Sequence, residues 1–337
     1  MSDLQTRLEN FLIHHNQSTV LQQITPDAST REYFRVRWHE NPAIACVYPF
    51  NELCKDQFEA CLDVTGVFLS ADLPVARIFA ADSENKIIIH EDFGDVILRA
   101  VLEKSDEAAR ENYLNEAIGL IARIQATTPK AFAAGSIASR LKFDFEKLSW
   151  ELDFFTTHYF TTLQKNPLTE TDAKLLKAEL DEVAKELEGL AKVLTHRDFH
   201  AANLMLQDGA LKIIDHQDAR IGAASYDLVS LLLDRVTILP TPEWLAEKRR
   251  FFLAERERFG LEKLDEDYFT YEFRLQTIQR CLKAIGTFSF QSSTRGKTYF
   301  IPYIKPMFEI VLRAAENLKR FPNLQRIIKN QIYENHR

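Results

Sequence analysis

Three oxygen-bearing side chains lie close together in one stretch of the chain. From position 196 the sequence reads His-Arg-Asp-Phe-His-Ala-Ala-Asn, which ends at Asn203, and Ile214-Asp215 follows. Phosphoryl transfer to a hydroxyl needs a carboxylate that orients the hydroxyl and takes its proton, and Asp198 suits that task. It also needs oxygen ligands for Mg²⁺, which bridges nucleotide phosphates, and Asn203 and Asp215 suit that task. The stretch therefore predicts a catalytic carboxylate together with ligands for Mg²⁺ and ATP.

A β-hairpin is expected to carry Asp215. Leu204-Met205-Leu206 and the apolar run from Leu211 to Ile214 flank Asp208-Gly209, a dipeptide typical of two-residue hairpin turns. The second strand would then deliver Asp215 from its C-terminal end. The alternative is a polar loop between core strands, with turn residues in place of ligands. Turn chemistry alone does not account for all three side chains, so we favour phosphoryl transfer.

Two nearby histidines, His200 and His216, offer another interpretation: a metal cluster with Asp198 and Asp215. Catalytic zinc is usually held by a fixed, His-rich set, and Asn203 is a poor ligand for zinc. Mg²⁺ prefers oxygen ligands, so the spacing favours magnesium.

The bulk composition is that of a soluble globular protein. At 337 residues the chain is long enough for two lobes with separate cores. The net charge of −7 argues against nucleic acid as a partner, because a phosphate backbone requires a basic footprint. No run approaches the roughly 18 apolar residues of a membrane span, and the N-terminus lacks a secretory signal. We expect a cytoplasmic protein with reduced cysteines and no membrane segment.

Glycine is scarce, with 10 residues in the chain, and the first is Gly66. Neither G-x-x-x-x-G-K-[ST] nor G-x-G-x-x-G occurs, which excludes Walker-type and Rossmann nucleotide sites.

The first part of the chain predicts a small sheet with helices. Helical periodicity covers residues 3–15 and 54–71. Strands are expected over residues 20–24, 34–38, 43–48, 78–81 and 86–90. After the acidic segment 91–95 the pattern changes to long amphipathic helices. They are expected near residues 107–126, 141–163, 170–189, 226–236, 242–259, 266–289 and 303–318. The chain is therefore predicted to be α+β, with a small strand-rich lobe followed by a larger helical lobe.

Five segments carry a family resemblance. They are Asp27 to Val36 (D-A-S-T-R-E-Y-F-R-V), His90 to Asp95 (H-E-D-F-G-D), Thr195 to Met205, Ile214 to Ala219 (I-D-H-Q-D-A) and Ala223 to Asp234. In these the chain resembles the aminoglycoside phosphotransferase-like small-molecule kinases. Within that family it is similar to bacterial anomeric kinases of N-acetylmuramate and N-acetylglucosamine, which act in cell-wall recycling. The resemblance implies a two-lobed protein-kinase-like fold, with a nucleotide-binding lobe of residues 1–93 and a catalytic and acceptor-binding lobe of residues 94–337.

The resemblance also implies roles for single residues. Asp198 would be the catalytic carboxylate, and Asn203 and Asp215 would be the Mg²⁺ ligands. Glu91 and its neighbours would offer backbone groups to the adenine of ATP. Structural support of the catalytic loop is implied for His196 and Asp227.

The phosphate-binding part departs from the family pattern. The third strand, Ile44-Ala45-Cys46-Val47-Tyr48, shows no phosphate-binding Lys or Arg, and the loop over the phosphates has no glycine to let the backbone approach closely. The hydroxyls of Ser29 and Thr30, with Arg31 or Arg35, would have to replace them.

The acceptor pocket is expected among the helices after residue 140. Sugar hydroxyls need partners that make several hydrogen bonds, and Trp150 could offer a ring face for stacking. The candidates by position are Asp144, Glu151, Gln217, Arg220, Gln279, Arg280 and Lys283, of which Asp144, Gln217 and Arg280 are preferred. The basic members favour a neutral or anionic sugar over a cationic acceptor.

We therefore predict an ATP- and Mg²⁺-dependent phosphotransferase whose acceptor is the anomeric hydroxyl of an N-acetylated amino sugar. One alternative keeps the chemistry with another small alcohol, such as an aminoglycoside, choline or homoserine. The other is a nucleotide-binding regulator with weak catalysis, suggested by the missing lysine.

Overall fold

The structure is a computed structural model that describes residues 3–24 and 31–333, apart from the side chains of residues 52–55. The chain divides into two compact units. The first comprises residues 1–113, 129–138 and 201–219, and the second comprises residues 114–128, 139–200 and 220–337.

The first unit is built on a five-stranded antiparallel sheet of order β1-β2-β3-β5-β4. Its strands are β1 Gln22–Ile24, β2 Glu32–Trp38, β3 Asn41–Val47, β4 Ile78–Asp82 and β5 Ile87–Glu91. In the register of β2 with β3, Tyr33 lies opposite Cys46 and Phe34 lies opposite Ala45. Successive residues of a strand point to opposite faces, so the tyrosine and the phenylalanine belong to different faces of this sheet.

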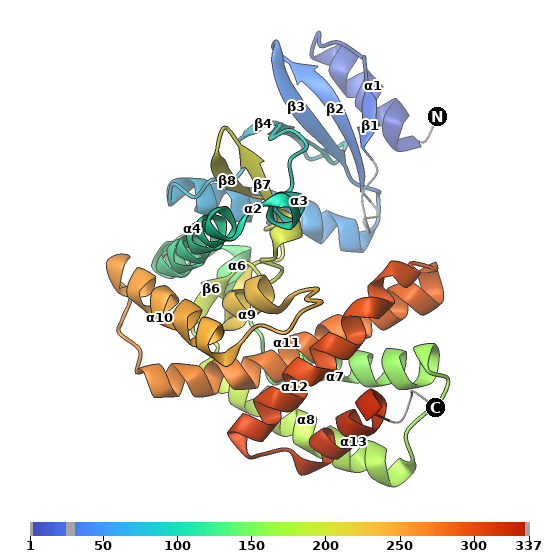
Figure 1. Cartoon of the computed structure of the whole chain (residues 1–337). Coiled ribbons are helices and arrows are strands. Elements are labelled where there is room, and N and C mark those ends of the chain that lie inside the picture. The colour runs from blue at the N-terminus through green and yellow to red at the C-terminus, as the bar shows by residue number, and fades with distance from the viewer. Residues whose placement is uncertain (1–2, 25–30, 334–337) are drawn as a thin grey trace. The chain divides into compact units, whose positions relative to one another are not determined.

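A helix covers each face of the sheet. Helix α1, Asp3–His14, lies along one face (Figure 1) and packs Leu8, Phe11 and Leu12 against Phe34 and Trp38. Helix α2, Glu52–Ser70, covers the other face. There Phe58 and Cys61 pack against Cys46, Tyr48 and Ile88. The face covered by α2 also carries Tyr33.

The predicted hairpin is confirmed and belongs to this first unit. Strands β7, Leu204–Gln207, and β8, Ala210–Ile213, pair through a turn at Asp208 and Gly209, where φ is 52° and 78°. Positive φ at both turn positions is what a tight two-residue hairpin turn requires. The N–H of Ile213 donates to the carbonyl of Pro74 at 2.8 Å, which fixes β8, and so the following Asp215, to the rest of the unit.

The second unit is mainly helical. Its helices are α7 Phe145–Thr156, the π-helix η1 Thr157–Leu163, α8 Glu170–Leu190, α9 Tyr226–Leu233, α10 Pro242–Arg258, α11 Glu266–Arg295, the 3-10 helix η3 Thr298–Tyr303, α12 Ile304–Leu318 and α13 Pro322–Tyr333. Two short strands, β6 Val193–Thr195 and β9 Arg220–Gly222, pair beside them. The remaining elements are α3 Leu98–Lys104 and η2 Ala201–Asn203 in the first unit, and α4 Glu107–Ala126, α5 Thr128–Ala133 and α6 Ile137–Arg140, which contribute residues to both units.

Helix α11 runs through the middle of the helical unit, between α7 and α12 (Figure 1). Asp265 caps its start by accepting from the N–H of Tyr268, and Gly296 ends it with φ of 69°. Gly286 allows the close packing on α7, because a Cβ there would lie 2.7 Å from the Cα of Phe155.

Most predicted helices are confirmed, and the differences have local causes. The helix expected from residue 141 begins at Phe145, since the side chain of Asp144 caps it and the N–H of Phe143 donates to the carbonyl of Ile221. Helix α11 continues to Arg295 rather than ending at residue 289. Elements that were not predicted are α3, α5, α6, α13, β6 and β9. None of the described helices is long and apolar enough to cross a lipid bilayer.

Candidate active site

In the second unit, the loop that leads to Asp198 is held by Asp227. Strand β6 ends at Thr195, and Asp227 lies in the first turn of α9, fully buried. Its Oδ2 accepts from the N–H of His196 at 2.7 Å, and its Oδ1 accepts from the N–H of Arg197 at 3.1 Å. The backbone of Arg197 has a φ of 82°, a conformation that residues other than glycine rarely adopt. Two hydrogen bonds to the Asp227 carboxyl therefore stabilise a strained turn directly before Asp198.

Asp198 lies among cations of the same unit. From its Oδ1, Lys283 Nζ is 3.0 Å and Arg280 Nη2 is 3.5 Å away, and Arg197 Nε is 3.8 Å from Oδ2. Burial raises the pKa of this carboxyl, but the neighbouring positive charges, that of Lys283 foremost, outweigh burial and hold the pKa of Asp198 well below its usual range. The side chain keeps 29% of its surface exposed. Asp198 is thus an ionised and accessible carboxylate that can accept a hydrogen bond from a hydroxyl.

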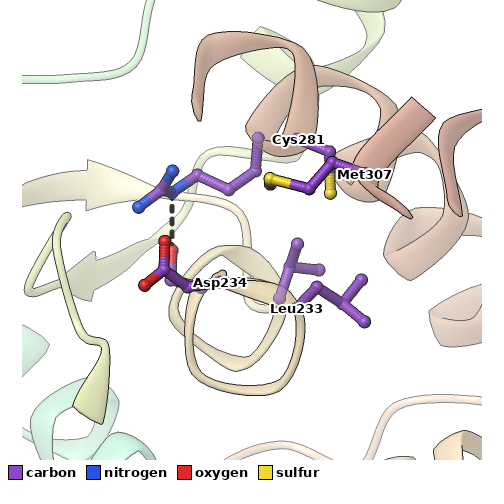
Figure 2. A pocket seen from close by; sticks show the side chains of 7 residues that line it. Leu233, Asp234, Cys281 and Met307 are labelled. Atoms are coloured by element: carbon purple, nitrogen blue, oxygen red, sulfur yellow. Dashed lines mark hydrogen bonds between the residues drawn. The ribbon is translucent and has the colours of Figure 1, made fainter. Parts of the chain in front are cut away.

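Arg280 is held in place by a hydrogen bond to Ser230 on α9. Its Nε donates to Ser230 Oγ at 2.8 Å, and a small pocket lies beside this contact. Figure 2 shows Leu233 and Asp234 facing Cys281 and Met307 across it. The pocket is too narrow to admit a water molecule, so it is not a ligand site. The residues that line it hold the arginine in place.

Asn203 and Asp215 both belong to the first unit, where the backbone links them. The N–H of Ile214 donates to the carbonyl of Asn203 at 3.1 Å. Asp215 has φ of 61°, and 41% of its side chain is exposed. Its Oδ1 accepts from Gln217 Nε2 at 3.0 Å and lies 3.4 Å from Arg31 Nη2. Its Oδ2 makes no hydrogen bond within the described residues.

This donor set fits Mg²⁺. An exposed carboxylate oxygen and a side-chain amide are hard oxygen donors, and Mg²⁺ is commonly bound by one or two such groups together with phosphates and water. The residues described contain no group of three or more His, Cys, Asp and Glu side chains arranged to hold a metal. His216, which could have joined such a group, instead contacts Thr65 Oγ1 at 2.7 Å and stacks on Phe68. Asn203 and Asp215 therefore remain the predicted ligands for the metal.

The nucleotide-loop candidates are placed only in part. Ser29 and Thr30 lie outside the described residues. Arg31 is described, and its side chain is 11% exposed beside Asp215. The carboxylate of Glu91 pairs with Arg77 at 3.0 Å, and the N–H of Glu91 donates to the carbonyl of Arg77.

The residues predicted to bind the acceptor lie in different parts of the structure. Asp144 is exposed and caps α7, where its Oδ1 accepts from the N–H of Lys147 at 2.8 Å. Gln217 is buried beside Asp215 in the first unit. Arg280 and Lys283 lie at Asp198 in the second unit. Glu151 is almost fully buried, and its Oε2 accepts from Gln279 Nε2 at 2.8 Å.

Two contributors were missed from the sequence. Lys147, on α7, lies 3.9 Å from Glu151, and Thr65, on α2, supports the residue after Asp215. The spacing of Lys147 four residues before Glu151 could have indicated the first pair. No local pattern marks Thr65.

Known proteins match this chain over most of its length. Residues 20–266 match the phosphotransferase enzyme family. A protein of Neisseria meningitidis serogroup B named N-acetylmuramate/N-acetylglucosamine kinase is 29% identical over 316 residues, which cover 92% of this chain and 90% of the relative. A protein of the same name from Pseudomonas aeruginosa is 26% identical, with 86% and 82% covered.

Solved structures show the same fold. A microcompartment-associated aminopropanol kinase superposes with a TM-score of 0.64 at 15% identity, covering 93% of this chain and 98% of the other. APH(2″)-IIa in a ternary complex with streptomycin and ATP gives a TM-score of 0.58 at 12% identity, covering 96% and 99%. These likenesses confirm the predicted protein-kinase-like α+β fold. The chain therefore belongs to the phosphotransferase enzyme family and is a small-molecule kinase whose acceptor is a hydroxyl group.

Proposed function

We propose that this kinase uses ATP and Mg²⁺ to phosphorylate the anomeric hydroxyl of an N-acetylated amino sugar. The observation that carries the proposal is Asp198, an ionised carboxylate at the end of a strained loop that Asp227 holds from behind. The relatives named N-acetylmuramate/N-acetylglucosamine kinase support the choice of acceptor.

Asp198 is suited to orienting a hydroxyl rather than to pulling its proton away early. A carboxylate with a lowered pKa is a weak base. In phosphoryl transfer through a loose transition state the nucleophile is little deprotonated when its bond to phosphorus begins to form, so base strength matters less than position. The sugar oxygen forms a bond to the γ-phosphorus, the bond to the ADP oxygen breaks, and Asp198 accepts the hydroxyl proton. Bound at Asn203 and Asp215, Mg²⁺ would neutralise charge on the phosphates.

The surroundings of Asp198 favour an acceptor that carries negative charge. Lys147, Arg197, Arg220, Arg280 and Lys283 belong to the same unit. Burial lowers the pKa of Lys147, and its cationic neighbours lower it further against the opposing charge of Glu151. So many cations repel one another and disfavour a cationic acceptor such as an aminoglycoside or choline. N-acetylmuramate, which bears a carboxylate, would relieve this repulsion.

Glu151 adds a partner for the neutral part of a sugar. Its Oε1 is buried and makes no hydrogen bond within the described part of the chain. A buried carboxylate oxygen without a donor is costly, and a sugar hydroxyl, an acetamido N–H or a bridging water would satisfy it.

The test is phosphate transfer from γ-labelled ATP to a panel of acceptors. The panel contains N-acetylmuramate, N-acetylglucosamine, the methyl glycoside of each, an aminoglycoside, choline and homoserine. We expect transfer to the free N-acetyl sugars and none to the methyl glycosides, whose anomeric oxygen is blocked. Transfer to the methyl glycosides, only to a cationic alcohol, or to nothing in the panel would refute the proposal.

Variants tie the activity to the site. Asp198→Asn should lower kcat by about 10²–10⁴-fold with the circular dichroism spectrum unchanged. Asp215→Ala should abolish turnover, and chelation by EDTA should do the same to the wild type. Asp267→Asn, at an exposed position on α11, is the matched control and should keep full activity.

A further inference from the structure

We propose that Arg31 is the cation that binds the nucleotide phosphates in this chain, in place of the lysine that β3 lacks. The inference rests on the proposed function, because it assumes that the nucleotide occupies the first unit. It concerns a contact that is measured by binding, without any acceptor.

Arg31 lies beside the strand from which the lysine is missing. It directly precedes β2, whose first residue, Glu32, pairs with Val47, so Arg31 comes next to Tyr48 at the end of β3. Its guanidinium carbon is 5.6 Å from the ring centre of Tyr33 and 5.6 Å from that of Tyr48. These rings belong to the face of the sheet that α2 covers, where Cys46 also points. A cation directly before β2 thus occupies the face that a lysine on β3 would have supplied.

The guanidinium is largely buried and faces a proposed metal ligand. Its side chain is 11% exposed, and Nη2 lies 3.4 Å from Oδ1 of Asp215. An arginine keeps its charge even when buried, so burial there requires an anion. Charge-assisted hydrogen bonds are usually about 2.7–2.9 Å long, so the pair with Asp215 is a loose one.

A loose pair of this kind can exchange partners. A metal ion bound by the carboxylate of Asp215 would satisfy that charge, and the guanidinium would then be left facing the phosphates. Its planar array of N–H donors matches two phosphate oxygens at once. In the absence of nucleotide the same two residues neutralise each other, so neither charge is buried without a counter-ion.

Arg35, the other arginine that the sequence offered for the phosphates, is already engaged. Its Nε donates to Asp92 Oδ2 at 2.5 Å, and its Nη2 donates to Asp95 Oδ1 at 2.8 Å. The side chain of Asp92 is 6% exposed, which makes this a structural ion pair that would be costly to break. The choice between Arg31 and Arg35, left open by the sequence, therefore favours Arg31.

The test compares the affinities of ATP, ADP and adenosine by isothermal titration calorimetry, in EDTA and in Mg²⁺. In Arg31→Met, adenosine should bind as it does to the wild type, while ATP and ADP should bind at least about 10-fold more weakly in Mg²⁺, because a charge-assisted hydrogen bond to phosphate is lost. The loss should be smaller in EDTA, where Asp215 still pairs with Arg31 in the wild type. Arg31→Lys should recover part of the loss, because it restores the charge but not the planar donor array.

Arg37→Met is the matched control. Arg37 lies on the same strand, its side chain is 63% exposed, and it pairs with the nearby Glu40. This variant should bind all three ligands as the wild type does. Equal losses for adenosine and ATP in Arg31→Met, unchanged ATP affinity, or a wild type that binds no nucleotide would each overturn the inference. A wild type that binds ATP with this Arg31 dependence but transfers phosphate to no acceptor would instead refute the proposed function and leave Arg31 as a phosphate ligand.

Discussion

Asp198 owes its low pKa to a residue that lies 85 positions away in the sequence. Lys283 Nζ is 3.0 Å from Oδ1, and its charge is the largest of those that lower the pKa of the carboxyl. Replacing Lys283 by Met should raise the pKa of Asp198. Because the ionised form is the one that accepts the hydroxyl proton, activity is lost as pH falls through that pKa. The acid limb of kcat/KM should therefore move to higher pH in Lys283→Met.

A pH–rate profile that extends into acid below the ordinary pKa of an aspartate, about 3.9, measures this shift over the range in which circular dichroism shows a folded protein. The control is Lys174→Met, at an exposed position on α8. It should change neither the rate at neutral pH nor the pH at which the acid limb falls. Parallel profiles for Lys283→Met and wild type would show that this lysine does not set the charge of Asp198.

Asp227 makes the stability of the fold depend on pH in an unusual direction. Burial raises its pKa to about 7, although the N–H groups of His196 and Arg197 act in the opposite sense. A carboxyl whose pKa is higher in the folded than in the unfolded state binds its proton more tightly when folded. Its contribution to the free energy of unfolding is full below about pH 4 and is lost as the pH rises to about 7.

The Asp227→Asn variant tests this. An amide can accept from only one of the two backbone N–H groups and turns its own NH₂ toward the other, so we expect a loss of about 1–3 kcal/mol at pH 7. Urea unfolding at several pH values should show the gap to wild type widening toward pH 5, since the variant lacks the titrating group. A gap that is constant or narrows toward acid would contradict the raised pKa.

At the scale of elements, the packing of α11 depends on Gly286, although glycine has a low propensity for helices. A Cβ at position 286 would lie 2.7 Å from Cα and 3.0 Å from N of Phe155, and backbone atoms of α7 cannot move aside cheaply. Gly286→Ala should therefore destabilise the protein by about 1–3 kcal/mol, although alanine is the better helix former. Gly189→Ala on α8 is the control: no atom lies within 4 Å of its Cβ, and it should stabilise by about 0.4–1 kcal/mol. Thermal unfolding of both variants measures the difference. Equal signs for the two substitutions would mean that the α7–α11 contact is looser than the structure shows.

What the sequence predicts, and what it does not, follows from how local each signal is. The long helices and the hairpin before Asp215 have periodicity or turn chemistry within a few residues, and they were predicted nearly to their ends. Strands β6 and β9 have three residues each and exist because they pair with each other across the chain. Because the two strands are far apart in the sequence, no local pattern indicates that they pair.

The same distinction holds at the site. Asp198, Asn203 and Asp215 were predicted because one segment holds all three at a characteristic spacing. The positive φ at Arg197 and Asp215 could not be predicted, because these residue types disfavour that region and the surrounding hydrogen bonds impose it. Two of the three cations at Asp198, Arg280 and Lys283, come from another element, α11, so only the fold shows that they lie beside this carboxylate.

At the scale of the whole molecule, the overall charge and the charge around Asp198 have opposite signs. The chain carries a net charge of −7, whereas Lys283, Arg280 and Arg197 gather at Asp198. An anionic acceptor is attracted only by the local cations, over distances that salt screens with a Debye length of about 10 Å at 0.1 M. If the acceptor is the carboxylate-bearing N-acetylmuramate, its kcat/KM should fall several-fold when ionic strength rises from about 0.05 to 0.5 M, while that of neutral N-acetylglucosamine changes little. Initial rates at subsaturating acceptor and saturating ATP measure both, and N-acetylglucosamine serves as the control for salt effects on nucleotide binding. A parallel decline for the two sugars would locate the effect at the nucleotide, and a rise for N-acetylmuramate would mean that the net negative charge, rather than the local cluster, governs the approach of the acceptor.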